Sequence, residues 1–164
     1  QDSGAVVHAA GMKFDTDQTN NIAESNTLDD YEEGIITGAL TCGTGTISVD
    51  ATYDQLSYTK IGRLVHVQGS LVIDGVSSNA GTVSLNLPFT ATQLTESADV
   101  TCGIAAYYGM NALKSAAPIN IRISGGNSSA TLLEWTTTTE DGSDMAENFT
   151  SSSQLYISFQ YCVQ

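Results

Sequence analysis

Hydrophobic and polar residues alternate along much of the chain with the period of two that is typical of β-strands. The clearest example is RLVHVQGSLVID, residues 63–74. Its apolar residues fall on one face and its polar residues on the other, which predicts a strand with one buried and one wet face. Gly69 within it predicts a bulge or a close approach of other atoms. The apolar positions are Val65, Val67, Leu71 and Ile73.

The same alternation recurs in TVSLNLP (82–88), INIRIS (119–124) and QLYISFQYCVQ (154–164). Less regular candidates are TGTISVDATY, LSYTKIG, ADVTCGIAAYY and SATLLEWTT. Clusters of turn-forming residues separate them, notably DGVSSNAG (74–81) and SGGNSS (124–129). About eight or nine strands at this spacing predict an all-β antiparallel fold, a β-sandwich or a barrel, over residues 35–164.

Residues 1–34 have a different composition, with small, polar and acidic residues in the majority. Their few apolar residues are too sparse for an independent core. We therefore predict an extended acidic N-terminal arm or linker that either stays disordered or buries its apolar side chains against another surface. A neighbouring subunit would supply one.

The charge of the chain narrows its possible partners. Five Lys and Arg residues stand against eighteen Asp and Glu, and the net charge is -13. Such a field repels phosphate backbones and anionic lipids, so nucleic acid and membrane surfaces are not expected partners. No apolar run approaches the roughly 20 residues of a membrane-spanning helix.

The three cysteines stand sixty residues apart and fit neither a zinc ligand set nor a CxxC pair. An odd number cannot all pair within one chain. We expect free, buried thiols in a protein made in a reducing compartment. They are Cys42, Cys102 and Cys162.

The densest acidic stretch is LDDYEEG, residues 28–34. With GMKFDTDQTNNIAESNTLDDYEEG, then YTKIGRLVHVQG, then LNLPFTA, the chain resembles the C-terminal domain of tailed-bacteriophage fibre and virion structural proteins over nearly its whole length. In that family the acidic stretch usually continues with Thr, an aromatic residue, Thr and Pro, whereas this chain continues with IITGAL.

The resemblance implies a trimeric antiparallel β-sandwich or jelly-roll-like domain at the exposed end of a fibre or appendage of the tail or capsid. It implies a virion structural protein made in the host bacterial cytoplasm, with other copies of itself and other virion proteins as partners. Host attachment through a surface glycan or receptor is a further implied role.

Within this resemblance, LDDYEEG is expected at the junction of arm and domain. Its apolar and aromatic residues would anchor packing, while its acids face water or a basic group such as Lys60 or Arg63. The alternative is a calcium site, because hard cations take several oxygen ligands. The stretch and the second acidic cluster, EDGSDMAE (140–147), both lack the twelve-residue calcium-loop pattern, so no metal and no cofactor are expected. The junction residues are Leu28, Asp29, Asp30, Tyr31, Glu32 and Glu33.

The sequence shows no catalytic motif. His66 lies on the polar face of a strand, and no GxSxG elbow or other marked nucleophile accompanies it. We therefore predict that the chain is not an enzyme. A glycan hydrolase stays as the least supported alternative, because paired carboxylates are recognised by their distance in space.

A carbohydrate- or receptor-binding module is the second interpretation. Aromatic side chains stack on sugar faces and provide contact area at low entropic cost, which makes Tyr107, Tyr108 and Trp135 candidates for a binding surface. Adjacent strand residues point to opposite faces, so at most one of the two tyrosines is expected in the core. The alternative for Trp135 is a core position, in alternation with Leu133.

Overall fold

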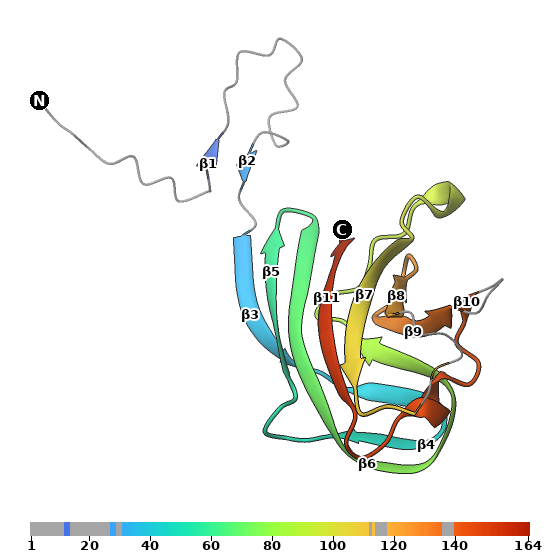
Figure 1. Cartoon of the computed structure of the whole chain (residues 1–164). Coiled ribbons are helices and arrows are strands. Elements are labelled where there is room, and N and C mark those ends of the chain that lie inside the picture. Colours follow the sequence, from blue (N-terminus) through green and yellow to red (C-terminus); the bar gives the residue numbers. More distant parts are fainter. Residues whose placement is uncertain (1–11, 14–26, 29–30, 112, 114–117, 136–139) are drawn as a thin grey trace, which may run out of the picture.

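The computed structural model of the chain describes residues 12–13, 27–28, 31–111, 113, 118–135 and 140–164. Strands make up nearly all of the regular structure, and two short 3-10 helices, η1 (Thr95–Ser97) and η2 (Met145–Asn148), lie between them (Figure 1). No helix of the described part is long and apolar enough to cross a membrane. The strands are β1 (Met12–Lys13), β2 (Thr27–Leu28), β3 (Tyr31–Thr37), β4 (Leu40–Val49), β5 (Gln55–Ile61), β6 (Leu64–Asn86), β7 (Thr101–Tyr108), β8 (Ile119–Ile123), β9 (Ser129–Trp135), β10 (Glu140–Asp141) and β11 (Gln154–Cys162).

The strands β1 and β2 pair with each other, and the other nine form one antiparallel sheet in the order β10-β9-β8-β7-β11-β6-β5-β3, with β4 beside β6. The predicted all-β antiparallel fold is confirmed. Four of the predicted strands with regular alternation lie in β6, β8 and β11, two of them in β6.

The long strand β6 organises the sheet, because its two halves have different neighbours. Residues 64–72 pair with β11 on one side and, up to Gly69, with β5 on the other. Residues 73–85 pair with β4, and residues 83–86 also pair with β9. Because β9, β8, β7 and β11 follow one another in the sheet, these pairings close a ring of strands that begins and ends on β6. The sheet is therefore a closed barrel with additional strands.

The core fills the inside of this barrel with the residues that the alternation predicts. Val65, Val67, Leu71 and Ile73 are all buried, and so are the inward residues of β8 and β11. Gly69 has a φ of 150°, and a Cβ there would lie 2.8 Å from a methyl group of Leu56. The expectation of a close approach at Gly69 is thus confirmed.

The expected turn at residues 74–81 is wrong, because this Gly- and Ser-rich stretch continues β6. It pairs with β4 through an irregular ladder, in which Thr44 faces Ala80 and Thr46 faces Ser77. Positive φ angles at Ser78 and Gly81 accommodate the irregularity. Turn-forming residues here produce bulges within a strand instead of ending it.

Two further expectations are affected by the structure. The strand β3 runs across the expected arm-domain boundary between residues 34 and 35, while the division into arm and domain stays a prediction. The cysteines are free as expected, but Cys102 and Cys162 are exposed and Cys42 is half-buried. The expected burial is wrong for Cys102 and Cys162 because both lie on the outward side of their strands.

Candidate functional site

The acidic stretch enters the sheet as the first half of β3. The hydroxyl of Tyr31 donates a hydrogen bond to Glu33 Oε2 at 2.9 Å, and the hydroxyl of Tyr58, on neighbouring β5, donates one to Glu32 Oε1 at 2.5 Å. Each hydrogen bond to a carboxylate raises the pKa of its tyrosine, since ionising the phenol would place two negative charges side by side. Two of the acids of LDDYEEG therefore act as acceptors for tyrosine side chains.

Gly34 explains the end of this stretch. A Cβ at Gly34 would lie 2.7 to 2.9 Å from the ring and hydroxyl of Tyr58, so only a glycine leaves room for that side chain. Lys60 lies opposite Glu32 in the register of β3 and β5. The guanidinium of Arg63 donates to the carbonyl of Val163 and to the hydroxyl of Thr92, and its pairing with the acids of LDDYEEG stays a prediction.

The remaining junction residues are Leu28, Asp29 and Asp30. Leu28 lies in β2, opposite Met12, while Asp29 and Asp30 lie outside the described residues. Among the residues that the structure describes, no group of three or more His, Cys, Asp or Glu side chains is arranged to hold a metal ion.

The predicted aromatic residues do not form one cluster. Tyr107 is half-buried against the core, whereas Tyr108 is 67% exposed, so the two point to opposite faces as expected. The backbone of Trp135 pairs with Glu140 at the start of β10, and its side chain lies outside the described part. Sequence reasoning missed Tyr156, an exposed outward residue of β11 whose hydroxyl donates to Gln154 Oε1 at 2.9 Å.

Tyr108 and Tyr156 belong to a larger surface, which we call the outer sheet face. It consists of the outward residues of β3, β5, the first half of β6, β11, β7 and β8, which follow one another in the sheet. Figure 1 shows all of these but β8 as long strands side by side. The outward apolar residues exposed on it are Tyr31, Ile35, Ile61, Leu64, Ile104, Tyr108 and Tyr156.

A shallow hollow of about 380 Å³ lies on the outer sheet face between β7 and β11. His66, Ser158, Gln160 and Asn120 line it together with Cys102 and Ile104. The ring nitrogen Nε2 of His66 lies 3.3 Å from Gln68 Oε1, so its side-chain partner is an amide. The described lining contains no carboxylate that could orient His66 as a catalytic base.

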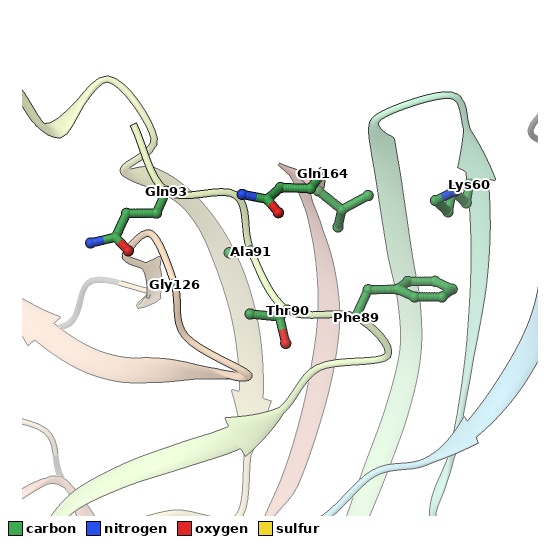
Figure 2. A pocket seen from close by; sticks show the side chains of 8 residues that line it. Lys60, Phe89, Thr90, Ala91, Gln93, Gly126 and Gln164 are labelled. Atoms are coloured by element: carbon green, nitrogen blue, oxygen red, sulfur yellow. The ribbon is translucent and has the colours of Figure 1, made fainter. Parts of the chain in front are cut away.

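A second hollow of about 380 Å³ lies where the loop after β6 passes the C-terminal residues (Figure 2). The ammonium of Lys60 lies 5.8 Å from the centroid of the Phe89 ring, and the Tyr58 ring meets Phe89 edge-on at 5.2 Å. Gln93 and Gln164 add amide groups to the lining. An aromatic ring with amides and one cation is a lining that suits a hydroxyl-rich ligand. The sequence signal that sequence reasoning overlooked is the aromatic residue after Pro88 in LNLPFTA.

The described chain is thus a closed antiparallel β-barrel with an exposed, partly apolar outer face. No protein-family model matches the sequence, and no curated protein matches it. Among solved structures, the crystal structure of the Dettilon tailspike protein (gp208) has the same fold, with a TM-score of 0.68 over 80% of this chain and 15% sequence identity. The match covers 23% of the tailspike chain. That LDDYEEG is a signature of such domains stays a prediction.

Proposed function

We propose that this chain is a structural domain of a bacteriophage tail appendage, such as a tailspike or fibre, on the exterior of the virion. The observation that carries the proposal is the fold shared with part of a phage tailspike over 80% of this chain. The resemblance of GMKFDTDQTNNIAESNTLDDYEEG and LNLPFTA to phage fibre domains supports it from the sequence. The proposed partners are two further copies of the chain, in a trimer, and other virion proteins.

The role we propose is structural and not enzymatic. The surroundings of His66 support this proposal. Its side chain interacts with Gln68, and the described residues that line its hollow include no carboxylate. The exposed free thiols Cys102 and Cys162 fit synthesis in a reducing bacterial cytoplasm.

Immuno-electron microscopy of the virus particles tests this function. Antibodies raised against the purified chain should place gold label at the tail of the particles. Label on the capsid would show that the appendage belongs to the head and not to the tail. Particles without label would contradict a virion role. An antibody against an unrelated host cytoplasmic protein is the control for carry-over.

A second candidate function is carbohydrate binding, and the hollow beside Phe89 favours it. An aromatic ring provides the stacking surface, and Gln93 and Gln164 provide amide donors and acceptors for sugar hydroxyls. If this site binds, a glycan array should give hits that Phe89→Ala weakens about two- to tenfold, the effect of losing one stacking contact. Tyr53→Ala, at an exposed tyrosine that lines neither hollow, is the matched control and should leave the hits unchanged. An array without hits would remove this candidate.

A further inference from the structure

The outer sheet face holds most of the large apolar side chains that the described chain exposes. Those that lie elsewhere are Tyr53, Leu94 and Val100. On the face, Tyr108 is 67% exposed and Ile104, also on β7, is 58% exposed. Single exposed apolar residues are normal on protein surfaces, but their concentration on one side of a sheet marks an interaction surface.

The same face carries little of the negative charge that dominates the rest of the protein. The chain has eighteen Asp and Glu residues, yet none is at an outward position of β5, β7, β8, β11 or residues 64–72 of β6, all of which the structure describes. The charged outward residues of the face are Glu33, on its edge strand β3, and Arg122, on β8. Depletion of charged residues is typical of the buried centre of protein interfaces.

The area of the outer sheet face is close to the area that each partner buries in a stable protein interface. The strand β11 is 9 residues long. The five longest neighbouring strands of the face are β3, β5, residues 64–72 of β6, β11 and β7. At about 4.8 Å between strands and about 3.4 Å rise per residue they cover roughly 650 Å². A standard protein interface buries about 800 Å² on each partner, so the face is close to one complete interface.

We propose that the outer sheet face packs against other copies of this chain, with three copies turning it toward a common axis. A basic partner would be attracted to the acidic surfaces and not to this face. Two copies with a net charge of -13 repel each other wherever their carboxylates meet, and this face is where they can approach without that repulsion. The proposal rests on the trimeric assembly of the proposed function and names the surface that forms it.

The test compares charge substitutions on and off this face. Ile104→Asp and Leu64→Asp place a carboxylate within it, and Leu94→Asp is the matched control, since Leu94 and Leu64 are exposed to 47% and 43%. All three side chains are exposed, so circular dichroism should show an unchanged fold. By light scattering at several concentrations, the wild type and Leu94→Asp should have the mass of three chains. The two face variants should dissociate at concentrations at least about tenfold higher than the wild type does.

The native cysteines give a second, independent readout. Cys102 and Cys162 are exposed at outward positions of β7 and β11, whereas Cys42, half-buried on β4, lies off the face. Maleimide labelling followed by peptide mass spectrometry measures each thiol separately. We expect Cys102 and Cys162 to react at least tenfold more slowly in the wild-type assembly than in Ile104→Asp, with Cys42 unchanged. The slow labelling of Cys102 and Cys162 should also disappear when the wild type is diluted until it dissociates into monomers. This measurement needs no variant, so it tests the inference even if Ile104→Asp fails to fold.

The possible results separate this inference from the proposed function. A trimeric wild type that both face variants leave intact, with reactive thiols, would overturn the inference and leave the appendage role standing. A wild-type monomer at every concentration would overturn both the inference and the proposed trimer, while the labelling of virus particles still tests the appendage role. Protection of the two thiols on particles but not in the purified assembly would overturn the inference in favour of contact with another virion protein.

Discussion

Gly45→Ala is expected to lower the free energy of unfolding by about 2–5 kcal/mol, from a left-handed backbone that costs about 1–2 kcal/mol and overpacking that costs about 1–3 kcal/mol. Gly45 has a φ of 75° in the irregular part of the β4–β6 ladder. A Cβ there would lie 2.2 and 2.3 Å from the carbonyl oxygens of Ser77 and Ser78. These are backbone atoms, so the ladder itself has to move.

Gly62→Ala is the matched control for this substitution. Gly62 has a similar φ of 56°, but a Cβ there would have no atom within 4 Å. It should therefore show only the conformational cost, about 1 kcal/mol. Urea unfolding at one fixed protein concentration measures both variants, because self-association makes stability depend on concentration. Equal losses for the two variants would show that β4 and β6 are not in close contact at this point.

The second large effect concerns alkaline pH and Tyr161. This side chain is buried, its hydroxyl donates to the carbonyl of Phe89 at 2.9 Å, and it accepts from the Phe89 amide at 3.2 Å. Burial raises the pKa of Tyr161 to about 12, with the backbone hydrogen bond to Phe89 acting in the opposite direction. Because the folded state favours the neutral phenol, its contribution is fully present below pH 10 and is lost as the pH rises through about 12.

We expect the wild type to lose about 2–3 kcal/mol of stability from this group between pH 10 and 12. Tyr161→Phe should be less stable by about 1–2 kcal/mol at pH 8, since the polar backbone of Phe89 loses its partner. Its stability should then fall less steeply with pH, so the two curves converge. Unfolding curves at fixed pH values from 8 to 12 measure this, with Tyr53→Phe as an exposed control. Parallel curves for wild type and Tyr161→Phe would contradict the assignment.

The alternation of apolar residues was sufficient to predict the strands and most of the core. Val65, Val67, Leu71 and Ile73 are buried because a strand with one apolar face has only one way to lie on a core. The local pattern could not predict that β6 continues through residues 74–81, because that depends on residues of β4 that lie 27 to 36 positions earlier in the sequence and pair with it. Closure of the sheet through β9 depends on still more distant pairings.

The candidate surfaces were less predictable than the fold. Tyr108 was predicted because aromatic side chains are common in binding surfaces. Ile104, Leu64 and Tyr156 occupy outward positions of their strands, which the alternation pattern assigns to solvent. Their significance appears only when the order of the strands places them on one face. The same holds for Phe89, which meets Lys60 across a loop that the sequence alone does not position.

The position of β11 has a consequence for how the protein is made. This strand is the last in the chain, yet it lies between β6 and β7 in the closed ring. A chain emerging from the ribosome therefore presents the edges of β6 and β7 unpaired until residues 154–162 have been synthesised. Folding that depends on contacts so far apart in sequence is slow and exposes the unfinished sheet to aggregation. The barrel thus cannot close before residues 154–162 have been synthesised, and overproduction should depend on chaperones during that interval.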